Sequence, residues 1–336
     1  MRAVSSNSYS ENIMLVLEKE DKGKLHSLFE TSINLKFGER LINISCNNTV
    51  MPPFGIQVPE YCIKKITADI ENREEIIFDS TEKSLLFKDM DLKLNLRGKV
   101  YDSRILPVQA DKKNAEKNIK EILDYFLGNN EKNGFGIGSR EFVKVITDVE
   151  NSTLNEEVLV KINNIRKDIE AGKTEIKSYN YFLGRGEGLT PGGDDFIIGI
   201  MAAMNFFNHK KTGKLKKELM QDIYKKTTDI SAEYLYYGVI SCFSLNITEF
   251  CKKLLFDNIN SEEEKKAIID AAADLEETLK NDNATKEDIE AKLKTLTEKS
   301  HKLAEAMYKK EGGEAGAQPN QKAKKDDDDV IDAEVE

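Results

Sequence analysis

Hydrophobic and polar residues alternate with two different periods along the chain, and the change comes near residue 110. Residues 11–110 contain short apolar runs or two-residue alternation, in ENIMLVLEK, TSINLKFGERLINIS and SLLFKDMDLKLNLRGKVY. The leucines at 92, 94 and 96 fall on one face of an extended chain. The prolines and glycine of NNTVMPPFGIQVP indicate a turn that enters a short strand. The pattern therefore predicts strands with short turns in this part.

Helical spacing of apolar residues follows after about residue 112. We expect helices at residues 113–128, 155–171, 196–208, 213–227 and 230–256. The third of these is apolar on nearly all sides, which is typical of a buried helix. A loop with many glycines precedes it, at residues 173–194. Strands first and helices after predict an α+β domain over residues 1–258.

The pattern changes again at Ser261. The run SEEE pairs Ser261 with Glu264 as a capping box, and a second helix is expected to open at Thr285. Both segments carry an apolar stripe at helical spacing, so an α-helical hairpin is predicted at residues 259–310. Residues 311–336 have almost nothing to bury, and the pattern predicts a disordered acidic tail there.

Charge separates the same two parts of the chain. Residues 261–336 hold 22 acidic against 13 basic residues, a net charge of −9 of the chain's −10. This acidic balance argues against nucleic acid and against anionic membrane surfaces as partners. The start, MRAVSSNSYSEN, lacks the apolar run of a signal peptide, and no stretch is long enough to span a membrane. These features predict a cytoplasmic protein.

Cysteine and histidine usage fits the same interpretation. The four cysteines form no CxxC pair and lie in apolar surroundings, which is typical of reduced core thiols. The three histidines are widely separated along the chain, which argues against a zinc site.

The string GRGEGLTPGGDDF is the strongest candidate for a binding site. Its glycines are Gly184, Gly186, Gly188, Gly192 and Gly193. Glycine permits positive φ and close approach of the backbone, so successive N–H groups can point into one concavity. The buried helix begins directly afterwards, and its N-terminus favours an anion such as phosphate or carboxylate. The string matches neither the P-loop nor the G-x-G-x-x-G pattern.

Four other side chains in this string are candidates for the site. Thr190 offers a hydroxyl, and Arg185 a guanidinium that can bind a carboxylate or phosphate. Asp194 and Asp195 have a structural interpretation, as N-cap and first-turn acid of the helix. In a functional interpretation, one of them binds Mg²⁺ or orients an amide N–H of the substrate. No catalytic residue is assigned, and Mg²⁺ is the one candidate cofactor.

Residues 10–256 resemble the AllH family, a subunit of oxamate carbamoyltransferase. The family's G-x-G-x-G-L-T-P-x-G-D-D core is matched at Gly184, Gly186, Gly188, Leu189, Thr190, Pro191, Gly193, Asp194 and Asp195. A later T-x-x-S-x-x-x-L stretch is matched at Thr228, Ser231 and Leu235. The resemblance implies work on carbamoyl phosphate, oxamate and oxalurate in ureide and purine catabolism, together with partner subunits. A Gly-Ser-Ser-Gly-type turn that the family places near 256 is missing.

Residues 261–336 resemble the lid and tail of the chaperone DnaK, on the strength of the helical hairpin and the ending DDDDVIDAEVE. No actin-like phosphate loops and no peptide-binding sandwich precede them, so the resemblance implies no ATPase. The chain is expected to be a chimera. Three hypotheses follow: an AllH-like carbamoyltransferase subunit, a chaperone fragment that binds unfolded protein, and an anion-binding scaffold without turnover. A general base for the oxamate nitrogen is not apparent in the sequence.

Overall fold

The computed structural model describes residues 2–70, 74–107, 113–129, 132–147, 157–173, 176–209 and 212–255, with six single positions between 278 and 295. The chain divides into two units, Met1–Asp257 and Asn258–Glu336. The predicted hairpin at 259–310 and the tail at 311–336 lie outside the described residues apart from those six positions. The boundary at 258 and the disorder of the tail stay predictions.

The first unit begins with a sheet. Its strands in the described residues are β1 Arg2–Ser5, β2 Ser8–Ser10, β3 Lys22–Leu28, β4 Ser32–Phe37, β5 Arg40–Cys46, β6 Gly55–Val58, β7 Glu75–Asp79, β8 Ser84–Phe87, β9 Leu92–Asn95 and β10 Lys99–Tyr101. They join in the order β1-β9-β8-β7-β3-β4-β5-β6-β2-β10. Antiparallel pairs form most of it, and β1–β9, β5–β6 and β2–β10 pair in parallel.

The sheet is curled because its first two strands lie at distant places in this order. Only Ser6 and Asn7 separate β1 from β2 along the chain. The Ser6 N–H donates to the Asn95 carbonyl, and the Asn7 N–H donates to the Gln57 carbonyl. One short segment thus joins β9 on one side to β6 on the other. The core enclosed by the curled sheet is mainly aliphatic, with Ile33, Leu35 and Ile44 wholly buried.

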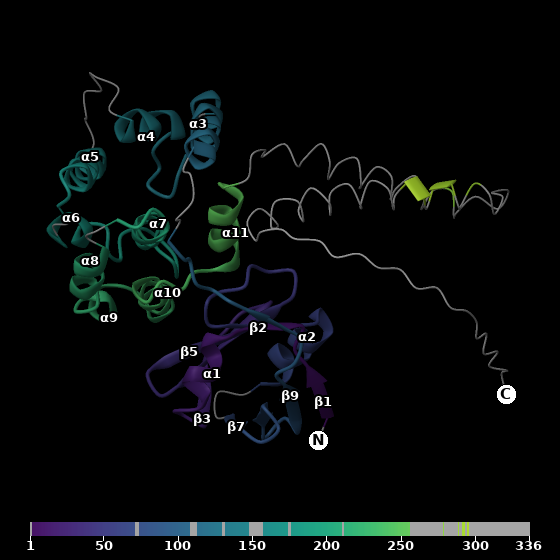
Figure 1. Cartoon of the computed structure of the whole chain (residues 1–336). Helices are drawn as coiled ribbons and strands as arrows, with labels where there is room; N and C mark the ends of the chain where they lie inside the picture. The colour runs from purple at the N-terminus through teal and green to yellow at the C-terminus, as the bar shows by residue number, and fades with distance from the viewer. Residues whose placement is uncertain are drawn as a thin grey trace, which may run out of the picture. The chain divides into compact units, whose positions relative to one another are not determined.

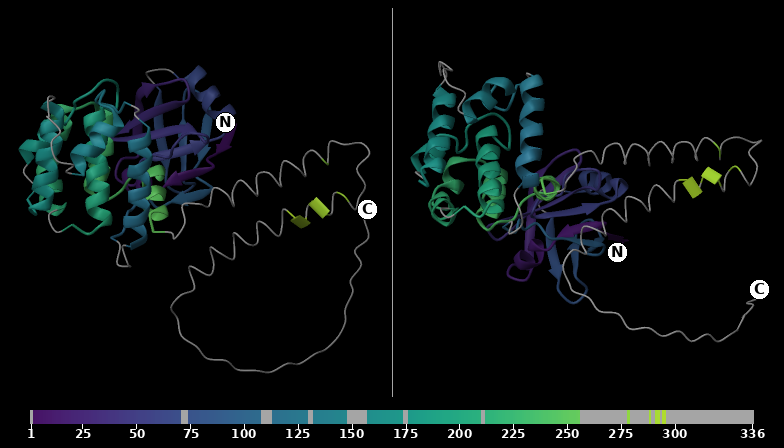
Figure 2. Two further views of the ribbon diagram at one scale, coloured as in Figure 1. Left: turned by 90° about the horizontal axis from the view of Figure 1, so that it is seen from above. Right: turned by 45° about the horizontal axis from the view of Figure 1, so that its top comes forward.

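Helices follow the sheet. In the described residues they are α1 Asn12–Leu17, α2 Glu60–Asp69, α3 Lys113–Gly128, α4 Ser139–Ile146, α5 Glu157–Glu170, α6 Ile176–Asn180, α7 Gly192–Phe206, α8 Thr212–Leu219, α9 Ile223–Lys226, α10 Asp229–Val239 and α11 Leu245–Lys253. Figures 1 and 2 show the strands with α1 and α2 in one part of the unit and the later helices in another. A sheet followed by helices confirms the α+β expectation for this part.

Two helices lie where strands were predicted. The run at Asn12–Leu17 forms α1, which buries Ile13, Val16 and Leu17 at helical spacing. The strand prediction was wrong because a short apolar run fits both periods, and only the face available for packing decides between them. The second, α2, begins after Pro59 and buries Cys62, Ile63 and Ile66. Two further helices were not predicted: α4, and the short α6, which interrupts the predicted loop.

The two long helices predicted near 213–227 and 230–256 are each divided in two. Residues 220–222 separate α8 from α9, and residues 240–244 separate α10 from α11. At the second break Ser241 has φ +69, and Cys242 forms an isolated bridge with Arg104. A residue with positive φ cannot continue a right-handed helix, so the chain turns here toward the sheet side of the unit.

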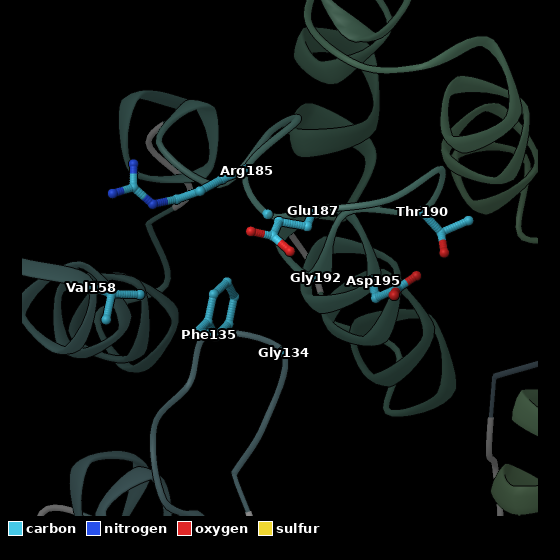
Figure 3. A pocket seen from close by; sticks show the side chains of 9 residues that line it. Gly134, Phe135, Val158, Arg185, Glu187, Thr190, Gly192 and Asp195 are labelled. Carbon is cyan, nitrogen blue, oxygen red and sulfur yellow. The ribbon is translucent and has the colours of Figure 1, made fainter.

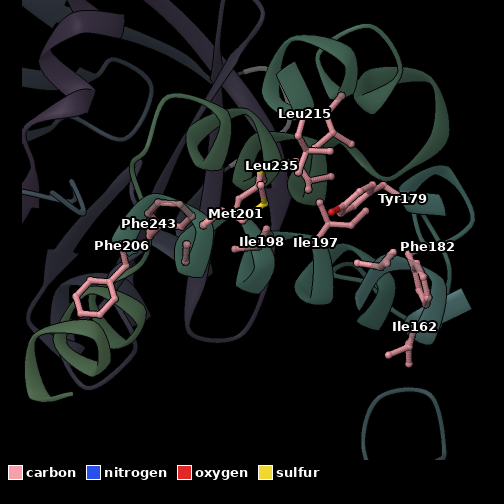
Figure 4. Close-up of a cluster of buried hydrophobic side chains, with 14 of the residues drawn as sticks. Ile162, Tyr179, Phe182, Ile197, Ile198, Met201, Phe206, Leu215, Leu235 and Phe243 are labelled. Atoms are coloured by element: carbon pink, nitrogen blue, oxygen red, sulfur yellow. The ribbon is translucent and has the colours of Figure 1, made fainter. Parts of the chain in front are cut away.

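The predicted buried helix is confirmed as α7, although it begins four residues earlier than expected. It buries Ile197, Ile198, Met201 and Met204, and it lies at the centre of the helical core. Figure 4 shows side chains of other helices, including Leu235 of α10, gathered around it. Within the described ranges, no helix is long and apolar enough to cross a membrane. All four cysteines are free and buried, as expected.

Arg40 joins the sheet to the helices. Its guanidinium lies 3.2 Å from the ring centroid of Tyr236 and donates to the Glu233 carboxylate, 2.7 Å away. Glu233 is 1% exposed, and burial raises the pKa of its carboxyl to about 7 although Arg40 lowers it. Phe54 stacks on Tyr237 nearby, at 5.6 Å between centroids. These contacts fix α10 against β5.

Candidate functional site

The glycine loop runs from Gly184 into the start of α7, and its backbone uses conformations that favour glycine. Gly184, Gly186 and Gly188 have φ +74, +123 and +87. A Cβ on Gly184 would lie 1.9 Å from the Lys226 carbonyl oxygen, so no other residue fits there without movement of the backbone. The Gly193 N–H donates to the Arg185 carbonyl at 2.8 Å and closes the loop.

A row of backbone donors is left unused along this loop. Within the described part of the chain, the N–H groups of residues 186–190 donate to no protein acceptor. These residues are also exposed. Successive unpaired N–H groups on a loop with positive φ make a concavity that suits an anion. The loop therefore has the donors that the sequence predicted for it.

The Asp194 side chain fixes the glycine loop through hydrogen bonds. This side chain is fully buried, and Oδ1 accepts from the Gly184 N–H at 2.7 Å. Oδ2 accepts from the hydroxyls of Thr227 and Ser231, the latter at 2.7 Å. The N-cap of α7 is Pro191 rather than either aspartate, so the N-cap prediction was wrong, and both acids lie in the first turn. Asp194 therefore has a structural role, because both of its carboxylate oxygens accept hydrogen bonds from the protein.

The T-x-x-S-x-x-x-L stretch also contacts the glycine loop. Thr228 caps α10, where its hydroxyl oxygen accepts from the Ser231 N–H at 3.1 Å. The same hydroxyl donates to the Leu189 carbonyl at 2.5 Å. Ser231 binds Asp194, as described above. The start of α10 therefore fixes both ends of the glycine loop, a relation that separation in sequence hides.

Beside the loop is a pocket of about 530 Å³, here called pocket 1. Its wall is formed by Gly134, Phe135, Val158, Arg185, Gly186, Glu187, Thr190, Gly192 and Asp195. In Figure 3, Arg185 lies on one side of this pocket and Thr190 and Asp195 on the other, with Glu187 between them. The Arg185 guanidinium stacks on the Tyr181 ring at 4.1 Å from its centroid. The pocket thus combines one cation with two carboxylates.

Pocket 2, of about 400 Å³, lies on the other side of Thr190 and Asp195. Its wall is formed by Val50, Pro53, Thr190, Asp195, Ile198, Tyr234, Cys242, Phe243, Ser244, Asn246 and Ile247. It is mostly apolar and brings the loop after β5 together with α7, α10 and the first turn of α11. No pattern in the sequence indicated it, because its residues come from four distant segments.

Asp195 differs from Asp194 because its carboxylate accepts no hydrogen bond from the described residues. Its carboxylate is on the wall of both pockets, and it is exposed. Desolvation, and to a smaller degree the charge of Asp194, raise its pKa above the ordinary value. Of the two aspartates, it is the one available to a ligand or to Mg²⁺. Within the described ranges no three His, Cys, Asp or Glu side chains form a group suited to a metal.

The structure brings most of the predicted residues together. Arg185, Gly186, Thr190, Gly192 and Asp195 are on the wall of pocket 1. Gly188 belongs to the row of unpaired donors, whereas Gly184, Gly193 and Asp194 shape the loop. No pattern in the sequence indicated Phe135 or Val158, which reach the pocket from other segments of the chain. Glu187 lies within the motif and was passed over.

Comparison with known families agrees with this site. Residues 2–100 match the AllH family N-terminal domain, and residues 182–278 match the model described as oxamate carbamoyltransferase subunit AllH. Together the two matches span more than half of the chain and include the glycine loop. The chain belongs to the AllH family. No solved structure matches it.

The second match extends the family resemblance beyond residue 256. It ends at residue 278, within the segment that also resembles the end of DnaK. The DnaK resemblance and the chimeric origin stay predictions, because they concern residues outside those that the structure describes. In this AllH-family chain, the loop and both pockets lie before residue 256.

Proposed function

We propose that this protein is a subunit of an oxamate carbamoyltransferase assembly and that its glycine loop binds the phosphate group of carbamoyl phosphate. Membership of the AllH family supports the assembly and its partner subunits. The main observation in support of the binding site is the row of unpaired N–H groups at residues 186–190, beside pocket 1.

The chemistry of carbamoyl transfer explains why such a loop is useful. Bond formation at the carbamoyl carbon places negative charge on its oxygen and on the departing phosphate. Backbone donors that are already fixed stabilise this charge without reorganising, and they act best where water is excluded. Arg185 supplies the one cation that the described residues place on the wall of pocket 1. Its stacking on Tyr181 keeps the guanidinium beside the loop.

Titration calorimetry of the full-length chain with carbamoyl phosphate, phosphate and oxamate tests the binding site. We expect Gly186→Val and Gly188→Val to weaken carbamoyl phosphate binding by at least about tenfold, which corresponds to about 1.4 kcal/mol. The reason is that a side chain blocks approach to the N–H groups. Arg185→Ala should cost about 1 kcal/mol, because the guanidinium is exposed.

The matched control is Gly199→Ala, on α7. A Cβ there meets nothing within 4 Å, so binding should be unchanged. Thermal unfolding of each variant separates lost binding from lost structure. Equal binding by wild type and both valine variants would show that the loop is not the site. Binding without carbamoyl transfer in the presence of the partner subunits would instead favour a scaffold without turnover.

A further inference from the structure

The two pockets meet at a single pair of residues. Thr190 and Asp195 are common to their walls, and the other residues of each wall differ. Pocket 1 contains the glycine loop, whereas pocket 2 lies toward the loop after β5 and the start of α11. A reaction between two small molecules requires such adjacent compartments, with the reacting atoms meeting at the junction.

Of the described residues that the two pockets share, Asp195 is the one whose side chain exchanges protons readily. Its carboxylate accepts no hydrogen bond from the described residues, unlike that of Asp194, which accepts three. Desolvation raises its pKa, which makes the carboxylate a stronger base than an ordinary surface aspartate. Its position in the first turn of α7, on a helix buried in the core, keeps it in place.

We propose that pocket 2 holds the nitrogen acceptor of carbamoyl transfer and that Asp195 takes the proton from that nitrogen. This rests on the function proposed above. The amide nitrogen of oxamate forms a bond to the carbamoyl carbon, and the bond from that carbon to the phosphate oxygen breaks. Phosphate leaves with the bonding electrons toward the glycine loop. The proton released from nitrogen passes to the Asp195 carboxylate, which gives oxalurate and phosphate.

The chemistry of pocket 2 fits a small acceptor with an amide and a carboxylate. The Tyr234 hydroxyl has no hydrogen-bond partner among the described residues and lines the pocket, as does the Thr190 hydroxyl. Ser244 and Asn246 place polar side chains on this wall at the start of α11, where the positive end of the helix dipole favours a carboxylate. The remaining wall is largely apolar, with Val50, Ile198 and Phe243. Such a wall limits water near the reacting nitrogen.

The test is steady-state carbamoyl transfer from carbamoyl phosphate to oxamate, using the full-length chain with its partner subunits. Asp195→Asn should lower kcat by at least about 100-fold. Carbamoyl phosphate affinity should stay within about threefold of wild type. Asp195→Glu restores a carboxylate and should recover at least about tenfold of the lost rate. The matched control is Glu249→Gln, an exposed carboxylate on α11 outside both pockets, which should keep the wild-type rate.

A second pair of variants tests which molecule occupies which pocket. Val50→Trp places bulk in pocket 2 and should raise the KM for oxamate at least tenfold while leaving the KM for carbamoyl phosphate unchanged. Val158→Trp, in pocket 1, should have the opposite effect. An unchanged kcat in Asp195→Asn would overturn the role of Asp195, and a raised carbamoyl phosphate KM in Val50→Trp would overturn the pocket assignment. Absence of carbamoyl phosphate binding in wild type would instead refute the proposed function itself.

Discussion

Removal of the Asp194 carboxylate should show how firmly the glycine loop is held. This fully buried group accepts from the Gly184 N–H and from the hydroxyls of Thr227 and Ser231. Asp194→Ala leaves the buried Ser231 hydroxyl and two partly buried donors without their acceptor. Hydrogen bonds to a charged group contribute about 1.5–3 kcal/mol each to stability.

The three contributions do not simply add, because they share one carboxylate and because its removal also relieves the cost of burying a charge. We expect Asp194→Ala to lower the free energy of unfolding by about 3–5 kcal/mol, as for other buried groups that lose their partner. Asp194→Asn keeps the shape and one acceptor oxygen, and the two hydroxyls can turn to accept from its amide. Its cost should be about 1–2 kcal/mol.

Urea unfolding followed by far-ultraviolet circular dichroism measures these losses. The matched control is Asp195→Ala, in the same helical turn but exposed, which should lose only about 0.3–1 kcal/mol through the helix dipole. Asp194→Ala should also weaken carbamoyl phosphate binding, because Gly184 loses its anchor. A loss below about 1 kcal/mol in Asp194→Ala would refute the reasoning, since unsatisfied buried donors cost at least that much.

Two further predictions concern the glycines and the sheet–helix contact. Gly184→Ala should cost roughly 2–4 kcal/mol in urea unfolding, through positive φ and a clash with the Lys226 carbonyl, whereas Gly188→Ala, in open space, should cost only about 1 kcal/mol. Similar losses of unfolding free energy in the two variants would contradict the clash at Gly184. Burial raises the pKa of the Glu233 carboxyl from 4.5 to about 7, so between these pH values the folded protein holds a proton at this site that the unfolded chain has lost. Its stabilising contribution is therefore present below pH 4.5 and is lost as the pH rises to 7, by up to about 3 kcal/mol. Glu233→Gln should remove this fall from the unfolding free energy measured against pH, and an identical profile in the variant would exclude Glu233 as its source.

Local chemistry allowed much of the architecture to be predicted. Periodicity separates the strand-rich start from the helices after residue 112, because the spacing of apolar residues is a property of the segment itself. The buried helix α7 and the glycine loop before it could be located for the same reason. Glycine permits positive φ, and Gly184, Gly186 and Gly188 all adopt it.

Tertiary packing decided what the local pattern left open. Asn12–Leu17 became a helix because the curled sheet offered a surface for Ile13, Val16 and Leu17. The long apolar segment after residue 229 breaks at Ser241, where the chain meets Arg104 and leaves the helical direction. Neither the sheet surface that α1 packs against nor the contact with Arg104 exists until distant parts of the chain have folded together.

At the site, the two adjacent aspartates also show what the sequence determines and what only the tertiary structure determines. The sequence determined that both follow the glycines at the start of a helix, but it did not determine their roles. Consecutive helical residues point about 100° apart, so the two carboxylates cannot make the same contacts with α10. Packing against α10 turned Asp194 toward Ser231 and left Asp195 at the junction of two pockets. Which carboxylate holds the loop and which is free for chemistry is therefore a property of the folded chain.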